Sequence, residues 1–287
     1  MESMQMIKSR IQSIGSTRQI TQSMRMVSTA KVQKSRNRMA GNRAFSEQIQ
    51  RFVGELPRSF GDSRHPYLKG NQSDAAAVIV ISGDRGLCGG YNLNVCKEAV
   101  ALADRISGKV RMVTVGVKAK DYFGRRRRKA ARSFTGVSET PFFDDAVEIG
   151  SIALDWFQRG EVGAVYLVYT RFQTLLSQTP LHSKLLPLEP DAGTESTGIA
   201  MRFEPESDAF LERVVPLYVN AVIYGALLES SACEQSARIT SMDAAVKNSD
   251  EMIASLTLLY NQARQGAITR EITEIVGGAE ALAQRKD

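Results

Sequence analysis

The 287-residue sequence has few of the residues that mark several common protein classes. Its three cysteines are too few, and odd in number, for the disulfide framework of a secreted domain. Its cysteines and two histidines form no C-x-x-C or H-E-x-x-H cluster, so we expect no metal site. No stretch approaches the roughly 18 apolar residues that span a bilayer, and the first ten residues lack the apolar core of a secretory signal. These absences predict a soluble protein of a reducing compartment.

Charge and apolar content narrow the class further. Hydrophobic residues make up 43% of the chain, which excludes intrinsic disorder and permits a packed core. The formal net charge is +6, but residues 1–60 carry 11 basic and 3 acidic residues, whereas residues 206–287 carry 7 basic and 12 acidic residues. The two ends therefore have opposite charge, which weakens the case for a nucleic-acid partner.

The first segment predicts one long helix. From about Ser3 to Leu56 it contains no proline, and between Ser3 and Ser46 it has nine basic residues and no acidic one. Apolar residues recur at the heptad spacing of three and four, with a phase that slips around residues 15–17 and then resumes. These positions are Met4, Ile7, Ile11 and Ile14, followed by Ile20, Met24 and Val27. A solvated basic helix packed on its own domain is the alternative.

The last segment predicts a second long helix with a more regular seam. Roughly eight heptads keep one phase from Leu211 to Ala267. Its seam includes the positions Ile239, Met242, Val246, Ile253, Leu256 and Tyr260. Several other seam residues are small, so a partner helix could approach closely, and Gly277-Gly278 offers a natural end.

Because one helix is basic and the other acidic, each suits the other as a partner. We therefore expect an antiparallel coiled coil within one chain, and a homodimeric coiled coil is the rival that the sequence leaves open.

The middle of the chain alternates strands and helices, which predicts a parallel or mostly parallel sheet. Predicted strands cover 76–82, 110–115 and 164–169, and predicted helices cover 93–106, 118–123 and 144–157. A polar loop marked by Pro187, Pro190, Gly193 and Gly198 precedes the last helix. The predicted organisation is an N-terminal coiled-coil helix (1–60), an inserted small Rossmann-like α/β domain (74–205) and a C-terminal coiled-coil helix (208–287).

A glycine-rich loop at residues 82–92 follows the first predicted strand. Such loops can hold phosphates with backbone N–H groups. However, this loop lacks the Lys-Ser/Thr pair of a P-loop and the G-x-G-x-x-G spacing of a dinucleotide site. A tight structural or contact loop is favoured, and a nucleotide-binding α/β enzyme that uses this loop is the alternative.

Two other features allow more than one interpretation. The basic run at 125–129 could bind phosphate or acidic lipid, although a solvated helix end explains it more simply. His65 and His182 each lie near a proline, which predicts exposed loop positions for both. Nothing here assembles an active site.

Three stretches of the sequence resemble the gamma subunit of the rotary F-type ATP synthase. The first comprises residues 7–11 (IKSRI), 19–27 (QITQSMRMV) and 30–31 (AK), and the second is the loop DRGLCGGYN at 84–92. The third and most specific is YNQARQGAITREITEIVGGA at 260–279. They follow the family's order across the whole chain.

The resemblance implies a central rotor shaft without a catalytic site or cofactor of its own. As one copy per complex, the shaft would couple ion-driven rotation of the membrane c-ring to ATP synthesis or hydrolysis at the beta subunits of an alpha/beta ring. The α/β domain would contact the epsilon subunit and the c-ring, with no nucleic-acid partner. The expected location is the membrane periphery, on the cytoplasmic face of a bacterial inner membrane or the matrix side in an organelle.

By motif match, the resemblance also implies contact residues. Met24, Cys88, Arg264 and Gln265 would meet beta subunits, and the basic surface near Lys31 to Arg43 would suit acidic beta-subunit lobes. The basic run at 125–129 and Arg25 depart from the family pattern. The plant-type regulatory insertion with paired cysteines is absent, so we predict no thiol switch.

Overall fold

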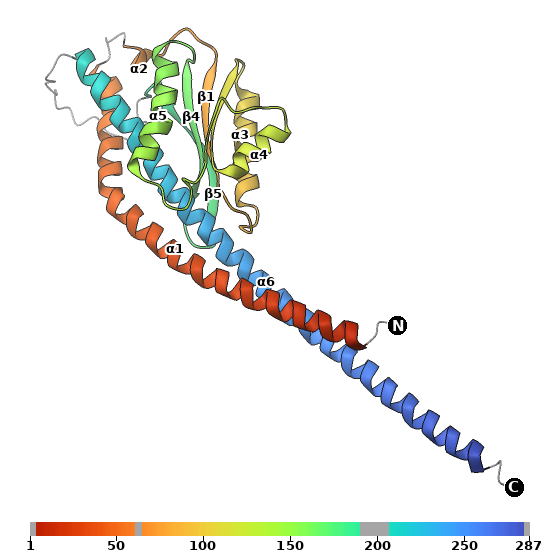
Figure 1. Ribbon diagram of the computed structural model, residues 1–287. Coiled ribbons are helices and arrows are strands. Elements are labelled where there is room, and N and C mark those ends of the chain that lie inside the picture. Colours follow the sequence, from red (N-terminus) through yellow and green to blue (C-terminus); the bar gives the residue numbers. More distant parts are fainter. Residues whose placement is uncertain (1–3, 61–64, 190–206, 284–287) are drawn as a thin grey trace. The chain divides into compact units, whose positions relative to one another are not determined.

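The computed structural model describes residues 4–60, 65–189 and 207–283. Two long helices flank, in chain order, a region of strands and shorter helices (Figure 1). The elements are α1 (Met4–Ser59), α2 (Pro66–Lys69), β1 (Ala76–Ile81), α3 (Tyr91–Arg105), β2 (Val110–Val115), α4 (Val117–Arg125), β3 (Arg132–Phe134), α5 (Phe143–Gln158), β4 (Ala164–Phe172), β5 (Gln178–Leu186) and α6 (Ser207–Ala283).

The five strands form one sheet in the order β3-β2-β1-β4-β5. β1 pairs in parallel with both β2 and β4, and β3 pairs in parallel with β2. β5 runs antiparallel to β4 and forms one edge. All six residues of β1 are buried, because this strand lies at the centre and both faces of the sheet are covered. The predicted Rossmann-like α/β domain is therefore confirmed.

Alternate residues of β1 pack into two different cores. Ala77, Ile79 and Ile81 belong to the core that contains residues of α5, α1 and α6. Val78 and Val80 belong to the core that contains residues of α3 and α4. The two shorter helices α3 and α4 thus cover one face of the sheet, while α5 covers the other (Figure 1).

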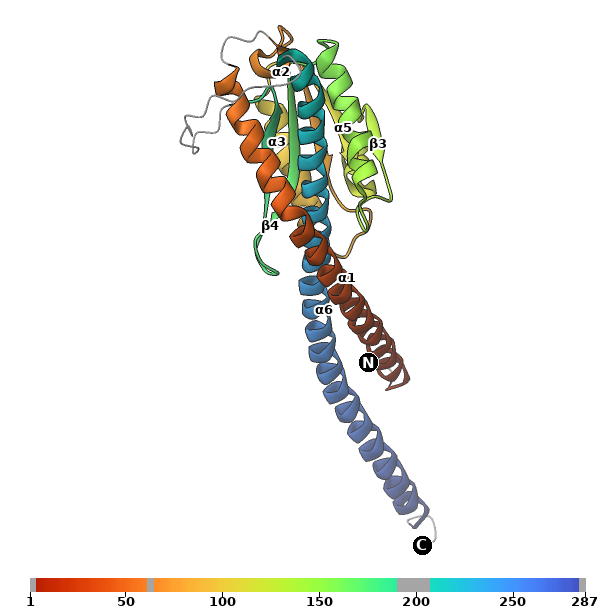
Figure 2. The same ribbon diagram turned by 90° about the vertical axis from the view of Figure 1, so that its left-hand side faces the viewer.

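The chain divides into two compact units, Ser28–Thr240 and a smaller unit made of Met1–Val27 with Ser241–Asp287. In the larger unit, the second half of α1 and the first part of α6 lie side by side (Figures 1 and 2). The Ser35 and Ser231 hydroxyls are 3.2 Å apart across this seam. A Cβ at Gly225 would stand 3.7 Å from the Ser46 hydroxyl, so the small residues allow the close approach that the sequence predicts.

In the smaller unit, two ion pairs define an antiparallel coiled coil. Arg18 Nε lies 2.5 Å from an Asp250 carboxylate oxygen, and Arg25 Nη1 lies 2.9 Å from Asp243. These ion pairs are exposed and contribute little to stability. They do define the register of the two helices, because in both pairs the residue numbers sum to 268. The basic helix pairs with the acidic helix within one chain, as predicted.

Burial along α6 follows the heptad spacing. Met242 and Ser249 are buried, and the seam residues between Ile239 and Ala267 are buried or half-buried, whereas Asp243 and Asp250 beside them are exposed. The half-buried seam residues are Ile239, Val246, Ile253, Leu256, Tyr260, Ala263 and Ala267.

The seam of α1 differs from the prediction. Ile20 and Val27 are 62% and 56% exposed, whereas Thr21 and Ser28 are 9% and 2% exposed. The phase therefore does not slip after Ile14 but passes through small polar residues. Because Thr21 and Ser28 are not apolar, the heptad pattern wrongly places their exposed neighbours Ile20 and Val27 in the seam.

Other boundaries also differ. The helix α6 continues through Gly277-Gly278 to Ala283, since a glycine inside a helix costs only about 1 kcal/mol. Neither β3 nor β5 was among the predicted strands, and His182 lies on β5 rather than in a loop. The predicted loop residues Pro190, Gly193 and Gly198 lie outside the described residues.

One part of α6, between Asp208 and Ala279, is apolar enough by composition to cross a membrane, contrary to the expectation from the sequence. An 18-residue window there has a mean hydropathy of 1.3, and 44% of that window is buried inside the protein. Residues of α6 from Leu211 to Leu227 belong to the core that α6 shares with the sheet and α1.

Candidate functional site

The glycine-rich loop at 82–92 connects β1 to α3 and is held by the carboxylate of Asp84. This carboxylate accepts hydrogen bonds from the backbone N–H groups of Val117 and Gly136, each at 3.0 Å, and from Ser138, whose hydroxyl is 2.9 Å away. Burial raises the pKa of Asp84, but these hydrogen bonds outweigh it and lower the pKa overall. Within the loop, the backbone N–H groups of Gly83 and Asp84 donate to the side chains of Asn92 and Ser138, at 2.8 and 3.0 Å, which favours a structural loop over a nucleotide site.

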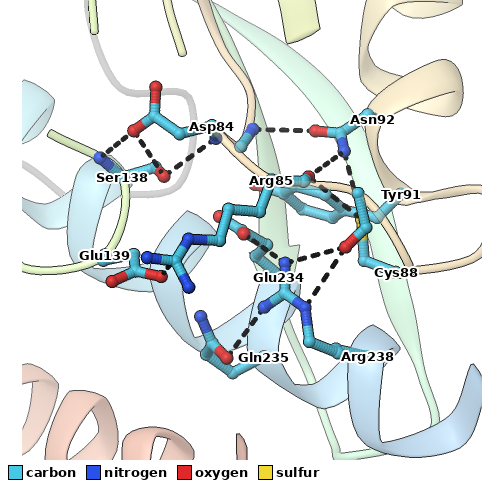
Figure 3. A network of polar contacts seen from close by, with 12 residues as sticks. Asp84, Arg85, Cys88, Tyr91, Asn92, Ser138, Glu139, Glu234, Gln235 and Arg238 are labelled. Atoms are coloured by element: carbon cyan, nitrogen blue, oxygen red, sulfur yellow. Dashed lines mark hydrogen bonds and ion pairs between the residues drawn. The ribbon is translucent and has the colours of Figure 1, made fainter. Parts of the chain in front are cut away.

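A buried ion pair on α6 fixes the same loop (Figure 3). Arg238 donates to Glu234 Oε1 at 2.6 Å, to Gln235 at 2.8 Å and to the Gly86 carbonyl oxygen at 3.1 Å. Arg238 and Glu234 are 5% and 0% exposed. Burial raises the pKa of Glu234, and the bond from Arg238 opposes that rise. A buried pair of this kind is sensitive to the loss of either partner, because the other charge is then left without compensation.

Gly83 brings the loop against this ion pair. A Cβ at position 83 would stand 2.7 Å from the Glu234 carboxyl group, so a side chain there would displace it. Asn92 braces the loop from α3, since its side-chain oxygen accepts from Gly83 N at 2.8 Å and its amide donates to the Arg85 carbonyl oxygen at 3.1 Å. The glycine content of the loop thus serves close packing on α6.

The Cys88 thiol faces inward. It is 2% exposed and packs with Tyr91 and Cys233, and the Tyr91 hydroxyl donates to the Ser230 carbonyl oxygen of α6 at 3.1 Å. Burial is the main cause that raises the pKa of the Cys88 thiol. The exposed side chains of the loop are Arg85 and Leu87, next to the exposed Gly89 and Gly90, and Leu87 has a left-handed backbone with φ +61°.

Glu139 links the loop to α1. Its two carboxylate oxygens lie 3.0 Å from Arg85 Nε and 3.1 Å from Lys31 Nζ. Lys31 therefore binds within the protein, although the sequence assigned it to a basic surface for partners. The glycine loop, α6 and α1 are joined in the larger unit by one polar network.

The remaining predicted contact residues lie on the smaller unit. Met24 is half-buried beside the exposed Ile20 and Val27, and Arg264 and Gln265 are exposed on α6. The register places Met24 opposite residue 244 of α6, about 30 Å along the helix from Arg264 at ~1.5 Å per residue. Within the smaller unit, Met24 thus lies on a different surface from Arg264 and Gln265.

Arg264 lies opposite Met4, the first described residue of α1, in the same register. Beyond the seam residue Ala267, no described residue of α1 lies opposite α6. The helix nevertheless keeps apolar side chains there, namely Ile268, Ile272, Ile275 and Val276, which are 47–66% exposed. Their spacing of three and four places them on one face.

Sequence reasoning missed the charges that organise the loop. Glu234 and Arg238 are four residues apart on α6, and Gln235 lies between them in the sequence. A pair of opposite charges at this spacing, inside an otherwise apolar and small-residue stretch, is the signal that could have identified them. Among the described residues, no three His, Cys, Asp or Glu side chains lie close enough to hold a metal ion.

Comparison with known proteins gives consistent matches over nearly the whole chain. The family model described as ATP synthase matches residues 3–282. The ATP synthase gamma chain of Pelotomaculum thermopropionicum is 42% identical, over 98% of this chain and 100% of its own length. The gamma chain of Acetobacterium woodii, named as sodium ion specific, is 39% identical over 98% of this chain and 99% of its own.

Solved structures share the fold. A chain of the Euglena gracilis mitochondrial ATP synthase, in a structure of OSCP, F1 and the c-ring, superposes with a TM-score of 0.69 at 18% identity and covers 99% of this chain and 96% of its own. A chain of the Tetrahymena thermophila mitochondrial enzyme, from its central stalk and c-ring, has a TM-score of 0.61 at 24% identity, over 79% and 99% of the two chains.

Proposed function

Because the chain belongs to the family of ATP synthase gamma chains, we propose that it acts as the central shaft that couples rotation of a membrane c-ring to ATP synthesis or hydrolysis on an alpha/beta ring. The observation that carries this proposal is the apolar stripe Ile268, Ile272, Ile275 and Val276, on a part of α6 that no described residue of α1 covers. A regular stripe of exposed apolar side chains on a helix marks a surface that a partner encloses.

The polar network around the glycine loop gives the shaft its second requirement, a firm connection to the α/β domain. Torque passes between the domain and the long helices only if the joint between them resists deformation. The buried pair of Glu234 and Arg238, the bond to Gly86 and the Glu139 ion pairs supply that resistance in the larger unit. Contacts with the ring, by contrast, must stay modest at each angle, because one deep energy minimum would stall rotation.

The shaft carries no catalytic site of its own in this proposal, and nucleotide chemistry takes place on the beta subunits. The bonding of the glycine loop supports this, since its N–H groups of Gly83 and Asp84 are bound by the side chains of Asn92 and Ser138. Met24, Arg264, Gln265 and the loop around Cys88 are proposed to meet beta subunits, with Arg85 and Leu87 as the exposed groups of that loop. Arg264 suits a carboxylate partner, because guanidinium binds carboxylates bidentately.

The other partners follow from the same proposal. One copy per complex would contact the epsilon subunit and the c-ring through the α/β domain. The chain would then lie at the membrane periphery, on the cytoplasmic face in a bacterium or the matrix side in an organelle.

Reconstitution tests the proposal. The purified chain should hydrolyse no ATP and should form a stable ATPase complex with alpha and beta subunits. Ile272→Asp with Ile275→Asp should weaken binding to the ring, whereas Arg270→Asp with Glu274→Asp, on the opposite face of the same turns, should bind more nearly as the parent does. ATP hydrolysis by the chain alone, or a chain that does not bind the ring, would refute the proposal.

A further inference from the structure

The basic run at 125–129 ends α4 and is not used by the network described above. Residues 117–132 contain eight basic side chains and one acidic side chain, Asp121. All five residues of the run are exposed. A cation in the last turn stabilises a helix through its interaction with the helix dipole, and Arg125 occupies this position in α4. The four cations that follow require another explanation.

The geometry of the run separates its cations into two sets. Arg126 stacks on the Tyr122 ring with its guanidinium carbon 3.8 Å from the ring centroid, and Arg128 donates to the Asp104 carboxylate of α3 at 2.8 Å. Backbone N–H groups of both residues also bond the Phe123 carbonyl oxygen, at 3.2 and 3.1 Å. These even-numbered residues fasten the loop to α3 and α4.

The odd-numbered residues Arg125, Arg127 and Lys129 make no side-chain bond to the part of the chain that the structure describes. Arg127 has a left-handed backbone conformation, with φ +57°, which residues other than glycine rarely adopt. A loop anchored through alternate residues thus presents three solvated cations, and its strained residue is one of them.

We propose that Arg125, Arg127 and Lys129 form a basic patch that binds an anionic membrane surface, a role that rests on the proposed place of the chain at a membrane. A flat set of long, solvated cations suits the diffuse potential of anionic headgroups. Single-stranded nucleic acid would favour exposed aromatic rings for base stacking, and the one ring beside the patch, Tyr122, is covered by Arg126.

The position of the patch in the fold agrees with this role. The loop 126–131 lies toward the amino ends of the parallel strands, because Ala131 N bonds the Met112 carbonyl oxygen and β3 begins opposite Val113. The glycine loop follows the carboxyl end of β1 and packs on α6. The patch therefore lies toward the end of the sheet opposite the contact between the glycine loop and α6. If that contact faces the alpha/beta ring, the patch faces away from the ring.

Vesicle binding by the full chain tests the proposal. Each cation near an anionic surface contributes about fivefold in affinity, so Arg125→Gln, Arg127→Gln and Lys129→Gln together should weaken binding about 100-fold on vesicles with about 30% phosphatidylglycerol in phosphatidylcholine. Binding should fall with added salt and should be absent on phosphatidylcholine alone.

The matched control removes three other exposed cations, by Lys34→Gln, Arg36→Gln and Arg51→Gln on α1. It should weaken vesicle binding much less than the patch variant does. Equal loss in the two variants, or parent binding that ignores lipid charge, would overturn the proposal. So would a parent chain that ignores the vesicles but binds polyglutamate through the patch, which would point to an acidic protein partner. Ring assembly, measured on the patch variant, should be unchanged, and its failure in the parent chain would count against the proposed function instead.

Discussion

Replacing Arg238 by methionine should destabilise the larger unit strongly. The substitution keeps most of the side-chain length but removes the charge that faces Glu234, which is fully buried. Loss of one partner of a buried ion pair costs about 3–5 kcal/mol, because the remaining charge is left without compensation. The Gly86 carbonyl oxygen loses its donor as well, so the glycine loop should loosen from α6.

The loss should depend on pH in a defined direction. Burial, the main cause, raises the pKa of Glu234 above its ordinary value of 4.5, and Arg238 limits that rise. Without Arg238 the pKa in the folded state rises further. A carboxyl group whose folded pKa is raised contributes stability below its unfolded pKa and loses it as pH rises through the folded pKa. The Arg238→Met variant should therefore be less impaired near pH 5 than near pH 8, since protonated Glu234 is cheaper to bury without a partner.

Urea unfolding followed by tryptophan fluorescence measures this effect in the correct unit. The chain has a single tryptophan, Trp156, on α5 in the larger unit. Arg43→Met is the matched control, because Arg43 and Glu47 form the same pair of residue types at the same spacing and at 2.6 Å, but exposed on α1. The control should leave the unfolding midpoint unchanged, since exposed pairs of this kind contribute little.

Similar midpoints for the parent and the Arg238→Met variant would refute the reasoning. An equal loss of stability at both pH values would also contradict it, because the destabilisation would then come from lost packing rather than from the unpaired carboxylate.

Three further predictions concern the loop and the seam. Asp84→Asn should lower stability by about 1–3 kcal/mol at neutral pH; because the folded pKa of Asp84 is lowered, the deficit in urea unfolding should shrink as pH falls through that pKa. Ile253→Asp should reduce the thermal stability of the coiled coil by about 1–3 kcal/mol, measured as helical circular dichroism, whereas Leu258→Asp, 61% exposed, should not. Thr21→Asp should likewise destabilise the coiled coil more than Ile20→Asp, and the reverse order would show that the seam passes through Ile20.

The architecture was predictable because periodicity and charge report it directly. The apolar run of β1 and the heptads of α6 indicate a buried strand and a long helix whatever surrounds them. The opposite charges of the chain ends indicated the pairing, and Arg18 and Arg25 do face Asp250 and Asp243.

The details that failed depend on contacts between distant residues. Thr21 and Ser28 look like surface residues in a sequence, and only the close approach of α6 to α1 buries them. The edge strand β5 contains Pro180 and has no clear alternation, so its pairing with β4 has no local signature. The spacing of Glu234 and Arg238 could have identified the pair, but not its contact with the glycine loop, because Gly83 and Gly86 lie more than 140 positions away in the sequence.

Burial along α6 explains how one helix can be both a rigid joint and an exposed contact surface. From Ala226 to Ser236 nearly every side chain is buried, and the helix there is held by the sheet, α1 and the glycine loop. From Ile239 to Ala267 the shielded residues are the seam positions together with Ser241 and Ala245, and from Ile268 onward every side chain whose burial is described is exposed. Local stability follows the density of buried contacts, so it must fall toward the carboxyl end. The region that depends most on a partner for its stability is thus the one that keeps an apolar stripe that no described residue of α1 covers, which is the arrangement a shaft inserted into a ring requires.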